Sequence, residues 1–205
     1  MNIQVFNQAS IKLTGSKTIY FDSYLLEEEK HDADIIFITH DHYDHYDIPS
    51  LKKAMNENTI VVVPTILKEE ASKLTNNIFV VEPNNTYTVD GITFETIPSY
   101  NHVAPYHPKD KEYVGYNVTI DGIKYYIMGD TDRTPETDKV KTDICFVPIG
   151  GTYTMNVDEA IDYINELKPK KAIPIHYGSI VGDIILGNEF KNRINKEIEV
   201  EILIK

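Results

Sequence analysis

Four side chains that can bind a metal ion are crowded into one short segment of the sequence: His40, His42, Asp44 and His45. They directly follow the apolar run 35–38, which is typical of a strand buried on both faces. A strand that ends in a tight loop can turn imidazoles and a carboxylate toward one point, and these donors suit zinc or a similar divalent ion. A histidine-rich surface turn would not explain why three of the seven histidines lie here. The segment therefore predicts a metal site.

Further candidate ligands lie downstream. Asp130 follows a strand-like run within the triplet Gly-Asp-Thr, and His176 follows the strand-like run 171–175. Taken alone, Gly-Asp-Thr is also an ordinary turn, and a histidine at a strand end is also a common core residue. Two more histidines, His102 and His107, share one loop. Together with the 40–45 segment, these positions supply enough donors for two metal ions and a bridging water.

The pattern His-x-His-x-Asp-His after a hydrophobic strand resembles the signature of the metallo-β-lactamase fold superfamily. Further matches lie at 129–131, 148–155 and 173–177, in the same order along nearly the whole chain. Together they resemble small stand-alone hydrolases related to ascorbate-6-phosphate lactonases and N-acyl-phosphatidylethanolamine phospholipase D. The resemblance implies an α/β (α+β) fold, a four-layer αββα sandwich with the metals at one sheet edge. Periodicity alone predicts only a mixed α and β domain.

The same resemblance implies which residues hold the metals. His40, His42 and one later histidine would hold the first ion. Asp44, His45 and His176 would hold the second ion, and Asp130 would bridge both. An aspartate such as Asp22 lies near the metal loop in this superfamily, although capping a turn at the end of a strand is an equal alternative.

The later histidine is His107 or His102. His102 follows the predicted strand 92–97 more closely, where several relatives of the superfamily place the ligand. The segment Tyr106-His107-Pro108-Lys109, followed by Val-Gly-Tyr at 114–116, resembles a subgroup pattern that retains the histidine before proline. We favour His107 and keep His102 as the alternative metal ligand.

The chemistry expected of this set is hydrolysis by a metal-bridged hydroxide, because two divalent ions lower the pKa of water and polarise a carbonyl or phosphoryl oxygen. Zinc is the expected ion, with manganese or iron as alternatives. Asp44 and Asp130 would be catalytic, since they can orient the hydroxide and exchange a proton. Tyr177 and Thr154 are the candidate substrate contacts, although most of the 14 tyrosines are expected simply to cover apolar core.

The predicted substrate is a small-molecule phosphodiester or lactone. Lys109 could meet a substrate phosphate, but a solvated loop lysine is the simpler reading. An RNA-processing nuclease is an alternative, and the net charge of −12 counts against nucleic acid as a partner. An iron enzyme that handles oxygen or persulfide is another alternative, as is a non-catalytic metal-dependent binding or sensing protein on the same fold.

The rest of the sequence predicts the elements that position these residues. Two Asp-Gly pairs, at 90–91 and 121–122, each separate two strand-like runs and predict β-hairpins. Asn156 and Glu159 match a capping box at the start of an apolar helix face that ends near Leu167. Thr65 could cap another helix. The other predicted elements are strands at 3–6, 11–13, 18–21, 34–39, 60–63, 144–147, 171–175 and 198–204, and helices at 49–56, 65–74 and 184–194.

Composition sets the broad class of protein. At 205 residues, with 41% hydrophobic and 25% charged residues, the chain 1–205 is expected to be a single globular hydrolase domain. No membrane segment or signal peptide is recognisable, and the lone Cys145 excludes an intramolecular disulfide, so a cytoplasmic location is expected. The sequence leaves open whether the protein forms a homo-oligomer.

Overall fold

The strands form two sheets. The computed structural model describes residues 1–102 and 105–204. The first sheet has six strands in sequence order: β1 (Asn2–Val5), β2 (Ile11–Thr14), β3 (Thr18–Phe21), β4 (Ile35–Phe37), β5 (Ile60–Pro64) and β6 (Ile78–Val81). The second sheet has seven strands in the order β13 (Glu199–Val200), β12 (Lys171–Ile175), β11 (Ile144–Pro148), β10 (Ile123–Ile127), β9 (Val114–Ile120), β8 (Ile92–Pro98) and β7 (Thr86–Val89).

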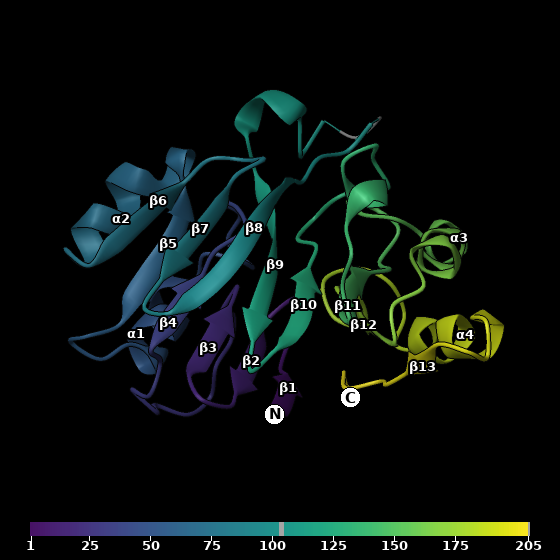
Figure 1. Cartoon of the computed structure of the whole chain (residues 1–205), viewed down its shortest axis with the longest axis horizontal. Coiled ribbons are helices and arrows are strands. Elements are labelled where there is room, and N and C mark those ends of the chain that lie inside the picture. Colours follow the sequence, from purple (N-terminus) through teal and green to yellow (C-terminus); the bar gives the residue numbers. More distant parts are fainter. Residues whose placement is uncertain (103–104, 205) are drawn as a thin grey trace.

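Helices cover the outer face of each sheet (Figure 1). Helices α1 (Ile48–Ala54) and α2 (Lys68–Leu74) pack on the first sheet, and α3 (Val157–Leu167) and α4 (Leu186–Arg193) pack on the second. Short 3₁₀ turns complete the connections: η1 (Thr65–Leu67), η2 (Lys109–Lys111) and η3 (Thr137–Lys139). This is the four-layer αββα sandwich that the sequence predicts. Within residues 1–102 and 105–204, no helix has the length and apolar character needed to cross a membrane.

The core between the sheets is built around Phe37 at the end of β4. Its ring stacks on Phe21 with centroids 5.1 Å apart, and it meets Phe94 and Tyr116 of the second sheet at 4.9 Å each. The buried Tyr116 hydroxyl donates to the carbonyl of Ile38 over 2.8 Å. Removing a buried phenylalanine ring of this kind costs about 3–5 kcal/mol. This packing fixes the point where the chain leaves β4 and enters the histidine-rich segment.

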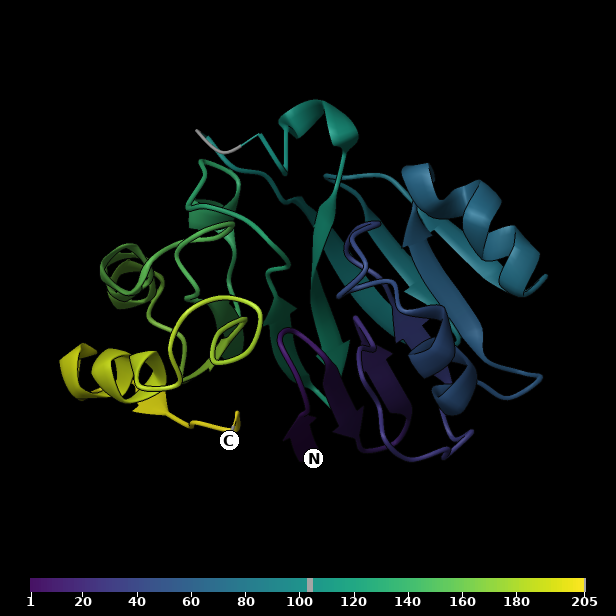
Figure 2. The ribbon, with the colours of Figure 1, turned by 180° about the vertical axis from the view of Figure 1, so that it is seen from behind.

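The loops after several strands gather at one end of the sandwich. Strands β10, β11 and β12 are parallel neighbours, so their carboxyl ends share one edge of the second sheet. Figure 2 shows the loop after β12 beside the loop between β1 and β2, where the His176 amide donates to the Gln8 carbonyl over 2.9 Å. The two sheets therefore bring their loops together at this end.

The local turn and cap signals of the sequence are present in the structure. Asp90 and Gly91 have φ of +46° and +78°, and Asp121 and Gly122 have φ of +50° and +78°. Positive φ at both central residues is the signature of the type I′ turn that joins two-residue hairpins. At the start of α3, the side chains of Asn156 and Glu159 form a complete capping box. The predicted hairpins and this helix start are confirmed.

Three sequence predictions differ from the structure. The final strand is only β13, because its pairing with β12 ends after two residues. Strand β6 was not predicted, since no turn signal separates it clearly from α2. Thr65 does not cap a helix: a 3₁₀ turn starts there, and its hydroxyl donates to the Val81 carbonyl over 3.4 Å.

Candidate metal centre

Seven potential ligands from four loops converge at the end of the sandwich where these loops meet. The loops follow β4, β8, β10 and β12. Six of the seven side chains are buried and one is partly buried. The seven residues are His40, His42, Asp44, His45, His107, Asp130 and His176.

Six of these residues form two groups of three, and within each group the ligand atoms lie within 4.8 Å of one another. The first group is His40, His42 and His107. The second group is Asp44, His45 and His176. The first group contains imidazoles alone, whereas the second includes a carboxylate.

Asp130 lies between the two groups. Its Oδ2 is 3.0 Å from Nε2 of His176 and 3.5 Å from Nε2 of His107, so one oxygen faces both groups. Its Oδ1 is 3.3 Å from Nε2 of His45. A carboxylate in this position can contact metal ions held by either group, as a bridging ligand does.

Asp22 orients histidines of both groups from behind. Its carboxylate accepts hydrogen bonds from Nδ1 of His45 over 2.8 Å and from the Thr39 hydroxyl over 2.7 Å. The same hydroxyl lies 2.9 Å from Nδ1 of His40. When Nδ1 carries the proton, Nε2 presents its lone pair to a metal. The sequence left open whether this residue caps a turn or supports the metal loop, and these contacts favour support of the loop.

His107 is oriented in the same way by a residue that the sequence did not mark. Its Nδ1 lies 2.6 Å from Oδ1 of Asn101, whose amide nitrogen donates to Asp132 over 3.0 Å. The alternative ligand His102 is exposed, and its Nε2 lies 2.9 Å from the carbonyl of Arg133. The structure thus brings His107, and not His102, to the cluster.

His176 sits in a strained backbone conformation. Its φ is +59°, in the left-handed region that non-glycine residues rarely adopt. Gln8, whose carbonyl accepts from the His176 amide, also has a positive φ, and its side-chain amide donates to Asp44 over 3.5 Å. The backbone of His176 packs directly against Gly150, where a Cβ would collide with the His176 carbonyl oxygen. Strain of this kind clusters at functional sites.

The two groups differ in their protonation. Burial lowers the pKa of His40 well below its usual value and the pKa of His107 to about 4. Burial would also lower the pKa of His176, but the facing carboxylates outweigh it and raise this pKa to about 9. Burial would raise the pKa of Asp130, yet the second-group histidines hold it well below its usual range. His40 and His107 of the first group are therefore neutral at neutral pH, while His176 binds a proton there in the metal-free protein.

Several ligand atoms have no hydrogen-bond partner among the described residues. They are Nε2 of His40, His45 and His176 and Oδ1 of Asp130, all buried. An unpaired buried polar atom costs about 1–3 kcal/mol, so four that face one point need an explanation. Divalent cations among them would satisfy all four, since neutral imidazole and carboxylate are the donors such ions prefer. The residues present therefore fit a metal centre.

The centre lies at the floor of a cavity of about 380 Å³. Four of the seven candidate ligands line the cavity: His42, Asp44, Asp130 and His176. Its walls come mainly from large side chains. The wall residues are Asp41, Tyr43, Tyr106, Tyr153 and Ile180.

The two residues predicted to contact substrate do not line this cavity. Tyr177 is fully buried, with its hydroxyl against Gly187 of α4, so its ring points into the core beneath that helix. Thr154 is also buried, and its hydroxyl donates to the Met155 carbonyl over 3.4 Å. The position of a residue beside His176 or in the 150–156 loop thus did not reveal the direction of its side chain.

Comparison with known proteins identifies the family. The profile of the beta-lactamase superfamily domain matches residues 2–176. A UPF0173 metal-dependent hydrolase of Thermoplasma volcanium is 31% identical, over 90% of this chain and 86% of that protein. Another UPF0173 metal-dependent hydrolase, from Thermococcus onnurineus, is 27% identical over 99% of this chain and 96% of that protein. A crystal structure from Parabacteroides distasonis, described as a metal-dependent hydrolase, gives a TM-score of 0.83 at 29% identity, covering 99% of this chain and 93% of that one. The chain belongs to the UPF0173 metal-dependent hydrolases of the beta-lactamase superfamily.

Proposed function

We propose that this metal-dependent hydrolase uses two divalent ions to hydrolyse a small-molecule phosphodiester or lactone. One ion would be held by His40, His42 and His107, and the other by Asp44, His45 and His176. Asp130 would contact both ions. The observation that carries the proposal is the convergence of buried, unpaired ligand atoms on one point at the floor of a cavity.

The donor set favours zinc. Five imidazoles and two carboxylates match the ligands that zinc takes in hydrolases, and manganese or iron are alternatives with the same donors. When bound, two such ions lower the pKa of water and polarise the carbonyl or phosphoryl oxygen that gains charge.

The protein's own residues supply orientation and proton transfer. Asp44 and Asp130 have pKa values held below their usual range despite burial, so both stay ionised near neutral pH. An ionised carboxylate at the cavity floor can accept a hydrogen bond from the attacking water and take up its proton. Asp22 and Asn101 hold His45 and His107 in one ring orientation, which keeps the ligand atoms in place before substrate arrives.

The remaining parts of the proposal come from the sequence. The narrower resemblance to ascorbate-6-phosphate lactonases and N-acyl-phosphatidylethanolamine phospholipase D is a prediction about substrate. The cytoplasmic location and the absence of a nucleic-acid partner are predictions as well.

The test is hydrolysis of bis(p-nitrophenyl) phosphate and of dihydrocoumarin, an aryl lactone, by protein loaded with zinc or manganese. We expect turnover of at least one substrate that is lost in Asp130→Asn. The matched control is Asp162→Asn, which makes the same change at an exposed position of α3 and should keep full activity. Equal turnover by the wild type and Asp130→Asn would contradict the proposal.

A further inference from the structure

The walls of the cavity above the metal centre are aromatic and apolar. Tyr43 is 65% exposed, Tyr106 is 50% exposed and Ile180 is 38% exposed, and all three line the same cavity, so they form one clustered apolar surface. Tyr106 and Tyr153 come from different loops, and their rings pack edge to face with centroids 4.7 Å apart. Tyr43 packs in the same manner on Tyr24 at 6.1 Å. Each wall tyrosine is thus held by a partner and presents a fixed surface.

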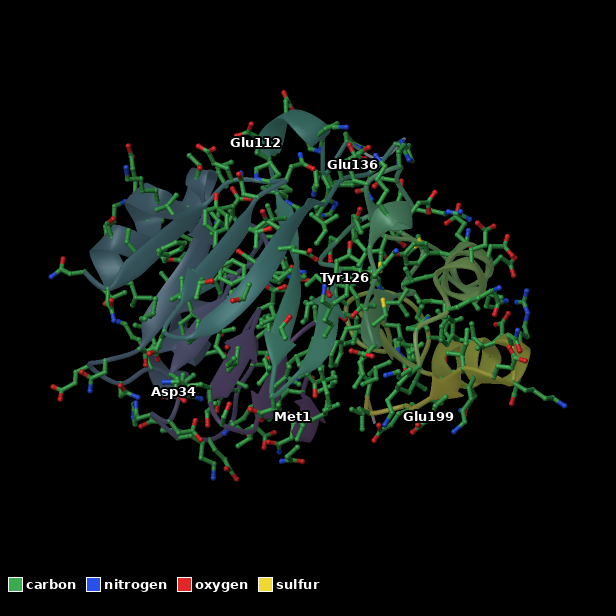
Figure 3. All side chains as sticks on the ribbon, viewed as in Figure 1. Met1, Asp34, Glu112, Tyr126, Glu136 and Glu199 are labelled. Carbon is green, nitrogen blue, oxygen red and sulfur yellow. The ribbon has the colours of Figure 1, made fainter. Side chains whose placement is uncertain are left out.

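The walls offer no positive charge. No lysine or arginine is among the cavity-lining residues of the described chain, and Asp41 is an acidic member of the wall. Lys109, on the loop of Tyr106, directs its Nζ to Glu136 at 2.7 Å and over the Tyr100 ring at 4.6 Å. Figure 3 marks Glu136 beside η3. Lys109 is thus paired with a carboxylate and is not among the residues that line the cavity.

An anionic substituent would therefore be poorly accommodated at the walls. It would give up hydration without gaining a cationic partner, and it would face the carboxylate of Asp41. An apolar or aromatic substituent would instead pack on the exposed tyrosine and isoleucine surface, where each buried ring contributes area and favourable edge contacts. Positive charge from bound metals would be confined to the floor, where the bond is cleaved.

We infer that the cavity selects a substrate whose substituent away from the cleaved bond is apolar or aromatic and not anionic, of the class of alkyl- or aryl-substituted lactones or phosphodiesters. It selects against substrates that carry an anionic group away from the cleaved bond, such as sugar phosphates and nucleotides. The inference rests on the proposed function and narrows both of its substrate classes by the substituent that lies away from the cleaved bond. The volume of about 380 Å³ is in the range of small-molecule sites.

The first test measures binding rather than turnover. The probes are 3,4-dihydro-2-quinolinone, a lactam that resists hydrolysis, and its 6-sulfonate, which adds a charge that binds zinc only weakly. Ligand-observed NMR on the zinc-loaded protein gives the two dissociation constants. We expect the neutral lactam to bind about tenfold more tightly than the sulfonate. Equal or tighter binding of the sulfonate would overturn the inference.

A pair of charge variants shows whether the wall is responsible. Ile180→Lys places a cation in the cavity wall and should reduce the preference for the neutral lactam by about tenfold. Ile185→Lys adds the same charge at a residue that is 63% exposed just before α4 and is not among the lining residues. It should leave the preference unchanged. Equal effects of both variants would also overturn the inference.

Hydrolysis of dihydrocoumarin and its 6-sulfonate separates this inference from the proposed function. A higher kcat/KM for the neutral lactone, again by about tenfold, is expected for the wild type. If neither of these lactones nor bis(p-nitrophenyl) phosphate is hydrolysed but the lactam pair is discriminated, the proposed function fails and the selectivity of the cavity stands. If both lactones are hydrolysed equally well, the proposed function stands and the inference fails.

Discussion

The first and second ligand groups share one cavity floor but differ in charge. The first group consists of imidazoles, and burial lowers the pKa of His40 and His107 in it. The second group contains Asp44, and carboxylates raise the pKa of His176 to about 9. A metal entering the first group meets these two histidines in their neutral form, whereas a metal entering the second must displace a proton. Two metal subsites on one scaffold therefore need not load alike.

The two groups are also supported differently. His107 of the first group is held by the neutral amide of Asn101, whereas His45 of the second is held directly by the carboxylate of Asp22, which reaches the first group only through the Thr39 hydroxyl. A carboxylate partner makes an imidazole a stronger donor to a metal than a neutral amide does. The second group should accordingly bind its ion more tightly at high pH, and the first group should be less sensitive to pH.

The largest expected effect comes from Asp130→Asn, which should weaken metal binding in both groups and so remove the difference between them. Asp130 faces both groups, so Asp130→Asn should weaken both subsites and lower kcat/KM by about a thousandfold. Zinc content per chain, measured by mass spectrometry after dialysis, should fall together with activity. A variant that keeps both ions and loses activity would assign Asp130 to proton transfer alone.

A next effect is confined to the first group. His107→Ala removes one of the three imidazoles of the first group. The zinc affinity of this group should fall by at least about a hundredfold, which exceeds the fall in affinity that usually follows the loss of a residue that only orients a ligand. The control is His102→Ala, since His102 contacts the Arg133 carbonyl and lies outside the cluster. Zinc titration with a competing chelator measures both. Loss of zinc in the His102 variant would reverse the assignment.

Smaller effects should come from the orienting residues. We expect Asn101→Ala to weaken the first subsite by about tenfold, and Asp22→Asn to weaken the second by 10–100-fold. Asp22 also accepts from the Thr39 backbone amide, so the melting temperature of each variant is needed to separate folding from metal binding. Identical effects on both subsites would mean that the two supports are not independent.

The smallest expected effect is the number of protons released when zinc binds to each group. The pKa of His176 is raised to about 9, so in the metal-free protein this group keeps its proton below that pH and loses it above. The pKa of His45 is also raised well above its usual value, so zinc binding to the second group near pH 7 should release protons from both histidines, and its affinity should fall as pH falls. The pKa of His107 is about 4, so binding to the first group should release none from that residue at the same pH. Calorimetry in buffers of different ionisation enthalpy reports both values.

Much of the scaffold could be predicted because its signals are local. An apolar run followed by His-x-His-x-Asp-His defines β4 and its loop, and Asp-Gly pairs require the positive φ that the hairpins show. Strand β12 has the predicted limits, since Pro169 and His176 bound it closely. Strand β6 was missed and the final strand was predicted too long, because the extent of both depends on pairing with other strands.

The site itself was only partly predictable. Ligand types and spacing pointed to the seven residues that converge, but the direction of a side chain depends on tertiary packing. Tyr177 was expected near substrate and is buried under α4, whereas Tyr43 lies between two ligands in sequence and forms a wall. Nothing in the sequence marks Asn101 as the partner of His107, because only the folded loop brings the two together.

The most direct test of the two-ion centre is anomalous diffraction from crystals of the protein loaded with zinc. We expect two peaks at the cavity floor, one about 2.0–2.1 Å from the nitrogens of the first group and one equally close to those of the second. Oxygens of Asp130 should contact both ions. A single peak, or peaks bound outside these two groups, would contradict the account.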